Sequence, residues 1–168
     1  MPSQLTSLQV EMEFWLGAAH VDVQAMDDIV CRHTLGGVRQ RPPLRREQVN
    51  GMLKGFIDLV FEHGGRYYVA DYKSNRLGPD DKAYDSARMR DEVLHHRYDV
   101  QYALYLFALH RLLRSRLGDA YSYDEHVGGA VYIFLRGHAA PSQGLHLEKP
   151  PRALVDELDA LFGAERQP

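Results

Sequence analysis

Apolar and polar residues alternate over residues 8–16, which predicts a β-strand with one face in a core. Two further apolar runs, residues 52–63 and 66–74, are separated only by two glycines and predict a β-hairpin with a tight primed turn. Residues 128–137, GGAVYIFLRG, are apolar almost throughout, so we expect an interior strand there.

Helical spacing and helix-end signals mark the segments between these strands. We expect helices over residues 21–33, beginning near Val23, and over residues 81–96, 99–118 and 150–163. Asp80 or Asp81 can cap the second helix, and Asp99 and Gly118 are the expected start and end of the third. Residues 39–48, RQRPPLRREQ, should form a loop, because two prolines remove backbone donors. This order predicts a mixed α/β domain with one sheet and helices covering its faces.

Composition places the chain among ordinary globular proteins. Its 168 residues fit one domain, and 45% apolar with 26% charged residues exclude a disordered or fibrous protein. No apolar run approaches the roughly 18 residues of a membrane span, and no signal-peptide pattern is present, so we expect a cytoplasmic protein. The single cysteine, Cys31, excludes an internal disulfide framework.

The charge is weakly negative overall but locally basic. A protein that holds nucleic acid by its overall charge is expected to be strongly basic, whereas this chain has a net charge of −3. Two basic clusters contain Arg39, Arg41, Arg45 and Arg46, and Arg111, Arg114 and Arg116. We interpret both clusters as solvated surfaces, because runs of charge usually are.

The predicted hairpin brings three charged residues to one face. With a two-glycine turn, Asp58 lies opposite Asp71, and Phe56 lies opposite Lys73. Side chains alternate between the faces of a strand, so Lys73 shares a face with Asp71, and Asp58 joins them as a cross-strand partner. Two opposed carboxylates about 5 Å apart destabilise a sheet unless a positive charge lies between them.

This arrangement favours a divalent metal ion. Magnesium and manganese prefer hard oxygen ligands, and the main-chain carbonyl of Tyr72 would add a third protein oxygen to those of Asp58 and Asp71. An ammonium beside the metal, that of Lys73, suits phosphodiester hydrolysis, because it can orient water and stabilise charge on a pentacoordinate phosphorus. The alternative from the spacing alone is a surface hairpin whose aspartates and lysine only pair with one another.

The combination of Asp58 with Asp71-Tyr72-Lys73 resembles the PD-(D/E)XK nuclease signature in its DYK form. Longer blocks resemble the carboxy-terminal nuclease domain of RecB, the beta subunit of exodeoxyribonuclease V (RecBCD). The blocks are EMEFWL, VNGMLKGFIDLVFEHGGRYYVADYKSNRLG, HHRYDVQYALYLFALHRLL and GGAVYIFLRG, in order over most of residues 9–137. The resemblance implies an α/β fold with a restriction-endonuclease-like core, in which a mixed central β-sheet is flanked by helices. It also implies metal-dependent DNA hydrolysis in double-strand-break repair and recombination.

The resemblance implies metal-binding roles for the two aspartates of the signature and a catalytic role for its lysine. Asp58 and Asp71 would hold a catalytic Mg²⁺, with Mn²⁺ as a substitute and Ca²⁺ able to occupy the same place. Lys73 would be the catalytic lysine. The family also uses an upstream histidine as a metal ligand, and none of the nine histidines of this chain fits that place.

Three further residues acquire a role only through the resemblance. Glu13 falls where the family carries an acidic residue near the site, and Gln101 and Tyr105 match a Q-x-x-x-Y pattern on one helix face. Taken without the family, Glu13 is an ordinary strand residue, Gln101 a polar helix position and Tyr105 a core residue.

The resemblance also implies partners and a larger context. The expected substrate is single-stranded DNA delivered by a helicase, and the expected protein partners are RecC-type and RecD-type subunits and a RecA-type recombinase. The chain has no G-x-x-x-x-G-K-[ST] loop, so ATP hydrolysis would reside elsewhere. We therefore expect residues 1–168 to be a single nuclease domain, a fragment of a longer helicase-nuclease that lacks the family's N-terminal helix.

Two other functions fit the same sequence. A shortened nuclease domain could dock a recombinase or a RecBCD partner subunit without cutting DNA. A stand-alone PD-(D/E)XK repair or CRISPR-associated nuclease is the other alternative. Such relatives often carry an iron–sulfur cluster held by several cysteines, which Cys31 alone cannot supply.

Overall fold

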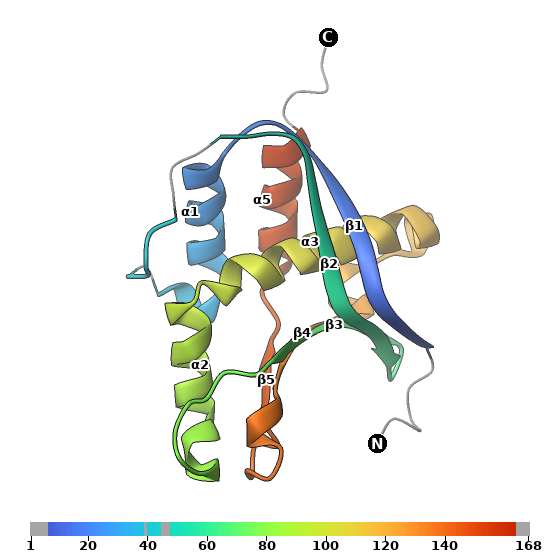
Figure 1. The fold of residues 1–168 in the computed structure, drawn as a ribbon. Coiled ribbons are helices and arrows are strands. Elements are labelled where there is room, and N and C mark those ends of the chain that lie inside the picture. Colours follow the sequence, from blue (N-terminus) through green and yellow to red (C-terminus); the bar gives the residue numbers. More distant parts are fainter. Residues whose placement is uncertain (1–6, 39, 45–47, 164–168) are drawn as a thin grey trace.

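Within the residues that the structure describes, five strands form one mixed β-sheet (Figure 1). The structure, a computed structural model, describes residues 7–38, 40–44 and 48–163. The strands are β1 (Ser7–Asp22), β2 (Gln48–His63), β3 (Arg66–Lys73), β4 (Val127–Phe134) and β5 (Leu145–Glu148). They lie in that order across the sheet; β3 and β4 are parallel, and the other neighbours are antiparallel. The predicted mixed sheet is confirmed, and β5 is an addition to it.

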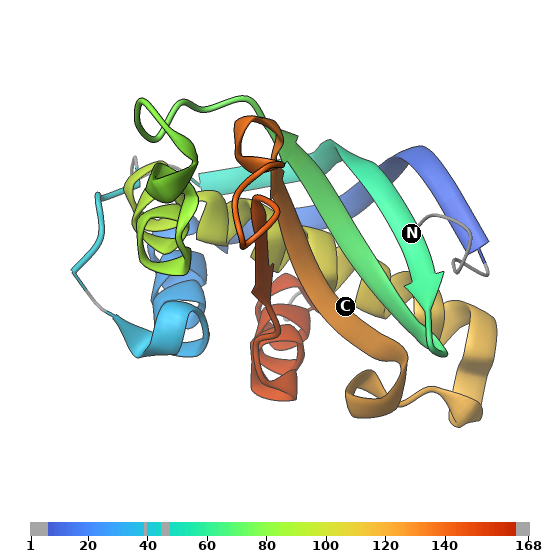
Figure 2. The ribbon, with the colours of Figure 1, turned by 90° about the horizontal axis from the view of Figure 1, so that it is seen from below.

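The helices lie close to the predicted boundaries, except that α2 begins later than predicted and α4 is an addition. They are α1 (Val23–His33), α2 (Ser86–His95), α3 (Tyr98–Leu117), α4 (Tyr123–His126) and α5 (Arg152–Gly163), with short 3-10 helices at Leu35–Gly37, Asp81–Tyr84, Gly118–Ala120 and Leu135–Gly137. Helices α2 and α3 lie in the connection between the parallel strands β3 and β4, and α1, α3 and α5 pack against one another on one face of the sheet (Figures 1 and 2). In the described part of the chain, no helix combines the length and apolarity needed to cross a membrane.

Strands β2 and β3 form the predicted hairpin around a two-residue turn. The two turn glycines have φ angles of 60° and 76°, which a primed turn requires. The predicted register holds as far as Leu59 opposite Ala70. Beyond this pair, β2 continues as a partner of β1, and Phe56 lies opposite Glu13 rather than pairing with Lys73. The two strands of the hairpin therefore separate next to the predicted charged residues.

Helix α3 lies across the sheet and carries part of the candidate site. Its inner face is apolar at helical spacing, and Tyr102, Leu106, Leu109 and Leu113 are almost fully buried. The helix ends at Gly118, as the sequence predicts, and the φ of 54° at this glycine lies in the left-handed region that favours glycine.

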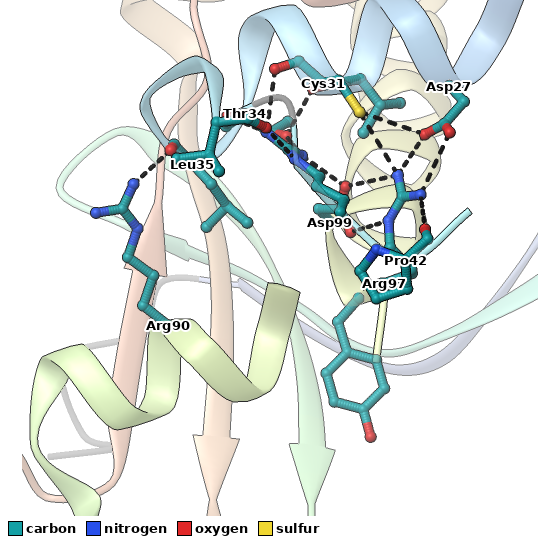
Figure 3. A network of polar contacts seen from close by, with 12 residues as sticks. Asp27, Cys31, Thr34, Leu35, Pro42, Arg90, Arg97 and Asp99 are labelled. Carbon is teal, nitrogen blue, oxygen red and sulfur yellow. Dashed lines mark hydrogen bonds and ion pairs between the residues drawn. The ribbon is translucent and has the colours of Figure 1, made fainter. Parts of the chain in front are cut away.

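The start of α3 corrects the predicted N-cap. The helix begins at Tyr98, and Arg97 before it has a left-handed φ of 56°. The side chain of Asp99 is fully buried and accepts hydrogen bonds from Arg41 Nη1 at 2.7 Å and Arg97 Nε at 3.1 Å. Arg97 also pairs with Asp27 of α1 (Figure 3). The carboxylate of Asp99, which the sequence predicts as a helix cap, instead forms ion pairs with two arginines in the core.

The two basic clusters differ in burial. Only 1% of the Arg41 side chain is exposed, and its guanidinium also donates to the Thr34 hydroxyl and to the Cys31 carbonyl, so the predicted solvated surface is wrong for this residue. Arg114 and Arg116 at the end of α3 are exposed, as predicted. Arg39, Arg45 and Arg46 lie outside the described residues.

The predicted helix over residues 81–96 is divided into two short elements. Asp80 caps the 3-10 helix by accepting a hydrogen bond of 3.1 Å from the Lys82 N–H. A second aspartate, Asp85, then caps α2 by accepting from the Arg88 N–H at 2.8 Å. The backbone at Asp85 is extended, which ends the 3-10 helix. The carboxylate of the same residue then caps the start of α2.

The outward-facing side of the sheet is apolar and exposed. The side chains there alternate with those that enter the core. Trp15, Met52, Phe56, Tyr72, Leu145 and Leu147 expose between 45% and 60% of their surface. Several exposed apolar side chains on one face of a sheet, unlike single scattered ones, are typical of an interaction surface.

Candidate active site

The three charged residues of the hairpin converge where β2 and β3 separate. The Lys73 ammonium lies 2.5 Å from Asp71 Oδ2, and these side chains expose only 10% and 9% of their surface. Asp58 Oδ2 accepts a hydrogen bond of 3.0 Å from the Tyr72 N–H, the backbone group between the other two residues. The structure thus places the three side chains close together, although the predicted pairing of Asp58 with Asp71 lies beyond the last recorded pair of the hairpin.

The local sequence explains this convergence. Alternation along β3 turns Asp71 and Lys73 inward, where both are buried, and turns Tyr72 outward, where it is 47% exposed. Asp58 lies just past the last recorded pair of β2 and β3, and its carboxylate supplies an acceptor for a backbone donor of β3.

Gln101 of α3 connects the charged residues to the helix. Its Oε1 accepts a hydrogen bond of 3.0 Å from Lys73 Nζ. The same oxygen lies 3.0 Å from Tyr132 Oη, whose one proton is shared between Gln101 and the main-chain carbonyl of Tyr98. The Nε2 of Gln101 donates to Tyr105 Oη at 2.9 Å and to Asp71 Oδ1 at 3.4 Å. The side-chain amide therefore has partners on both of its ends, which fixes its orientation. Gln101 and Tyr105, predicted as a pair, do lie together at the site.

Burial raises the pKa of Asp71 above its ordinary value of 3.8. The hydrogen bond and charge of Lys73 lower this pKa, and the negative charge of Asp58 raises it, but the loss of hydration is the largest cause. The Lys73 ammonium pairs with Asp71 but does not offset the combined effect of burial and of the neighbouring Asp58 on the pKa of Asp71. An added cation would be favourable at this point.

Tyr105 combines a buried ring with a hydroxyl that faces the site. Its ring packs edge-on against Phe14 of β1, with centroids 5.7 Å apart. Burial raises the pKa of Tyr105 to about 12, and the negative charge of Asp71 adds to the effect. The hydroxyl therefore stays protonated at neutral pH and is available as a hydrogen-bond partner of Gln101.

Glu13 lies on a different surface from the other predicted residues. Its side chain is 42% exposed, and its Oε1 lies 3.0 Å from Lys54 Nζ. The neighbouring Met12 and Phe14 point the other way into the core. Its described contacts are on the outer face of the sheet, away from the aspartates, and the role that the resemblance implies for it stays a prediction.

The available donors fit a hard divalent cation. Asp58 and Asp71 offer carboxylate oxygens, and the Tyr72 carbonyl belongs to the backbone between Asp71 and Lys73, so the donor set has the chemistry that Mg²⁺ prefers. Among the residues that the structure describes, no three His, Cys, Asp or Glu side chains gather as a metal cage. Solvent or substrate oxygens would have to complete the coordination.

Two tyrosines that the sequence analysis does not single out complete the surroundings of Lys73. Its Nζ lies 3.8 Å from the ring centroid of Tyr98 and 5.0 Å from that of Tyr132. Tyr98 opens α3 one turn before Gln101, and this i, i+3 spacing is a signal that could have identified it. Tyr132 sits in the apolar run of β4 and carries no such signal.

A family model for the PD-(D/E)XK nuclease superfamily matches residues 6–166, almost the whole chain. The chain therefore belongs to the PD-(D/E)XK nuclease superfamily, whose members generally depend on a divalent metal ion.

Curated relatives define the branch within this superfamily. The chain is 47% identical over 156 residues to the RecBCD enzyme subunit RecB of Escherichia coli (strain K12), which covers 92% of this chain and 13% of that protein. It is 42% identical over 156 residues to RecBCD enzyme subunit RecB of Haemophilus influenzae, covering 90% and 12%. For the subunit of the same name from Mycobacterium tuberculosis (strain H37Rv), the identity is 38% over 129 residues, covering 71% and 12%. The resemblance to RecB is confirmed, and the chain spans about one eighth of the length of these relatives.

Asp71 should limit the stability of the fold at neutral pH. Because its pKa is raised, the folded state binds a proton there more tightly than the unfolded chain does. The resulting cost of ionisation is present above the raised pKa and is lost as the pH falls below 3.8. We expect Asp71→Asn to melt at a higher temperature than the unsubstituted chain at neutral pH, and the difference to vanish in acid. Thermal unfolding followed by circular dichroism measures this; a lower melting temperature of the variant at neutral pH would show that pairing with Lys73 outweighs burial.

Proposed function

We propose that the chain is the Mg²⁺-dependent nuclease domain of a RecBCD-type exodeoxyribonuclease V, which hydrolyses DNA phosphodiesters in double-strand-break repair and recombination. The observation that carries this proposal is the convergence of Asp58, Asp71 and Lys73, with Gln101 bonded to the last two. Membership of the nuclease superfamily and 47% identity to a RecB subunit support it.

The carboxylates of Asp58 and Asp71 and the carbonyl of Tyr72 would hold Mg²⁺, with Mn²⁺ as a substitute and Ca²⁺ able to occupy the same place. When bound, a divalent cation neutralises phosphate charge and polarises the scissile phosphodiester. The buried, incompletely compensated charge of Asp71 favours such an ion. Metal affinity should rise with pH as Asp71 ionises, because a protonated carboxyl is a poor ligand.

Lys73 has a separate role in this scheme. Its buried ammonium is held by Asp71 and Gln101 instead of by solvent, so it presents a fixed positive charge. Such a charge orients the attacking water and stabilises the negative charge that develops on the phosphoryl oxygens. Gln101, itself bonded to Tyr105 and Tyr132, keeps the ammonium in place.

The proposed substrate and partners follow from the names of the relatives, which are subunits of the RecBCD enzyme. We propose that the domain acts on single-stranded DNA delivered by a helicase and works beside RecC-type and RecD-type subunits. Because the chain spans 13% of its E. coli relative, we propose that it is one domain of a longer helicase-nuclease. The RecA-type recombinase and the assisting role of Glu13 stay predictions from the resemblance.

Digestion of end-labelled linear DNA tests the proposed activity. We expect single strands to be degraded in the presence of Mg²⁺ and degradation to stop when EDTA removes the metal. The same assay is repeated with RecC-type and RecD-type subunits present, because the domain could cleave only DNA that these subunits deliver to it. No cleavage with Mg²⁺ or Mn²⁺ in either setting would reject the proposal.

Gln101→Leu should lower kcat roughly 10- to 100-fold, because groups that orient a metal site and its charged residues contribute effects of this size. The substitution removes the hydrogen bonds to Lys73, Asp71, Tyr105 and Tyr132, while the KM for DNA should change little. Steady-state digestion of a labelled oligonucleotide measures both quantities.

The matched control is Gln24→Leu, at an exposed glutamine of α1. Its kcat and KM should equal those of the unsubstituted chain. A Gln101→Leu variant as active as this control would contradict the positioning role of Gln101.

A second candidate function, docking of a RecBCD partner subunit without cleavage, is favoured by the exposed outer face of the sheet. Trp15, Phe56 and Tyr72 on this face expose 54%, 53% and 47% of their surface. Large apolar patches mark protein interfaces. A pull-down with RecC-type and RecD-type subunits and a nuclease assay on the same preparation separate the two functions; capture without cleavage in Mg²⁺ or Mn²⁺ would favour docking.

A further inference from the structure

The ammonium group of Lys73 lies among two polar and two aromatic groups. Its Nζ is 2.5 Å from Asp71 Oδ2 and 3.0 Å from Gln101 Oε1. The ring centroids of Tyr98 and Tyr132 lie 3.8 Å and 5.0 Å from the same nitrogen. A cation within about 6 Å of a ring centroid is attracted to the negative face of the ring. The two rings therefore act on Lys73 in addition to its hydrogen bonds.

Burial makes the contact with Tyr98 stronger than an exposed contact of the same geometry. The Lys73 side chain is only 10% exposed, so water cannot replace a partner that is lost. A desolvated cation is held by an aromatic face roughly twice as strongly as an exposed one, or more. Tyr98 is the nearer of the two rings and carries most of this effect.

Tyr98 is itself held in a fixed position. Its Oη accepts a hydrogen bond of 3.1 Å from Asn75 Nδ2, and its main-chain carbonyl accepts one of 2.7 Å from Tyr132 Oη. Arg97, the residue before it, is anchored by ion pairs to Asp27 and to a second buried aspartate (Figure 3). Its ring is held at the hydroxyl and its backbone at the start of α3, so Tyr98 can fix a flexible lysine in turn.

We propose that Tyr98 is a positioning residue of the nuclease reaction, whose ring face holds the Lys73 ammonium against Asp71 and Gln101. The proposal rests on the proposed function, because it assigns the ring a task in that reaction. Lys73 has four side-chain torsions, and its bonds to Asp71 and Gln101 direct the ammonium but leave the side chain some remaining freedom. The ring face removes this freedom without adding an acceptor that would compete for the ammonium.

Two substitutions separate the ring face from the hydroxyl. Tyr98→Leu removes the aromatic face and should lower kcat about tenfold or more, with the KM for DNA unchanged. Tyr98→Phe keeps the face and loses only the hydrogen bond to Asn75, so its kcat should stay within about threefold of the unsubstituted chain. The matched control is Phe107→Leu, which removes a buried ring from the same helix, where it packs on Phe162, and should leave kcat unchanged.

A series of fluorinated phenylalanines at position 98 tests the electrostatic part and avoids any loss of folding by the leucine variant. Each added fluorine weakens the negative potential of the ring face with little change in shape, so kcat should fall stepwise along the series. A ring that serves only as packing would give a constant kcat. A constant kcat, or an equal loss in Tyr98→Phe and Tyr98→Leu, would overturn the proposal.

A measurement independent of activity completes the test. The ε-methylene protons of Lys73 should show upfield NMR shifts, mainly from the nearer Tyr98 ring; Tyr98→Phe should retain these shifts and Tyr98→Leu should reduce them to the smaller contribution of Tyr132. Normal shifts in the unsubstituted chain would overturn the proposal even if DNA is cleaved. A chain with shifted protons that does not cleave DNA in Mg²⁺ would instead reject the proposed function, so the two failures are distinguishable.

Discussion

The Asp71→Asn variant should lose DNA cleavage almost completely, with kcat reduced roughly a thousandfold or more. The substitution keeps the shape of the side chain but removes the negative charge that a divalent cation needs. It also removes the carboxylate that the Lys73 ammonium contacts at 2.5 Å, so metal binding and lysine position are affected together. The initial rate of nucleotide release from labelled single-stranded DNA in Mg²⁺ measures the loss.

The control for this prediction is Asp119→Asn, an exposed aspartate beyond the end of α3. It should cleave DNA at the unsubstituted rate, because it changes the net charge equally but not the site. The raised pKa of Asp71 argues that Asp71→Asn stays folded, so unfolding should not account for its inactivity. Asp71→Asn cleaving at the rate of Asp119→Asn would remove Asp71 from the mechanism.

The Asp99→Ala variant should be the most destabilised single substitution near the site, with the free energy of unfolding lowered by about 3–5 kcal/mol. Asp99 is fully buried and receives the guanidinium groups of both Arg41 and Arg97. Removing the carboxylate leaves two buried positive charges with less compensation, which costs more than the pairing itself contributes. Urea unfolding measures the change as a shift of the midpoint at constant slope.

Asp156→Ala provides the comparison for an exposed ion pair. Its carboxylate pairs with Arg152 at 3.1 Å on the surface of α5, where 49% and 64% of the two side chains are exposed. Exposed pairs of this kind contribute about 0.5 kcal/mol or less. An Asp99→Ala variant as stable as Asp156→Ala would show that the buried network adds nothing to stability.

The hairpin that carries the site could be predicted because its determinants are local. Two glycines with positive φ set the turn, and the turn sets the register and therefore which side chains share a face. Asp71 and Lys73 meet because they are two residues apart on one strand, whatever the rest of the fold does. The end of α3 at Gly118 is local in the same sense.

The buried polar network could not be predicted, because it joins residues that are distant in the sequence. Asp99 satisfies the local rule for an N-cap, and Arg41 stands in a run of basic residues, yet the two pair across a separation of 58 positions. Strand β5 is similar: its four residues, LHLE, become a strand only by pairing with β4. Tertiary contacts override local preference in both cases.

In the candidate site, too, local spacing could be predicted from the sequence and tertiary contacts could not. Gln101 and Tyr105 share a helix face by spacing, but that this face meets Lys73 depends on how α3 crosses the sheet. Tyr98 carries only its i, i+3 spacing from Gln101 as a signal in the sequence, and its contact with the ammonium exists only in the folded chain. For Glu13, the strand pattern correctly indicates an exposed position, and its pairing with Lys54 is a cross-sheet contact.

Calorimetric titration with Mn²⁺, combined with cleavage assays, tests most directly that the two aspartates and the lysine form one metal-dependent site. Asp58→Asn preserves an acceptor for the Tyr72 N–H and should weaken Mn²⁺ binding roughly tenfold or more, together with cleavage. Lys73→Met should keep Mn²⁺ binding, since it removes a positive charge, and should nevertheless lose cleavage. Unchanged Mn²⁺ affinity in Asp58→Asn, or full cleavage by Lys73→Met, would contradict the account.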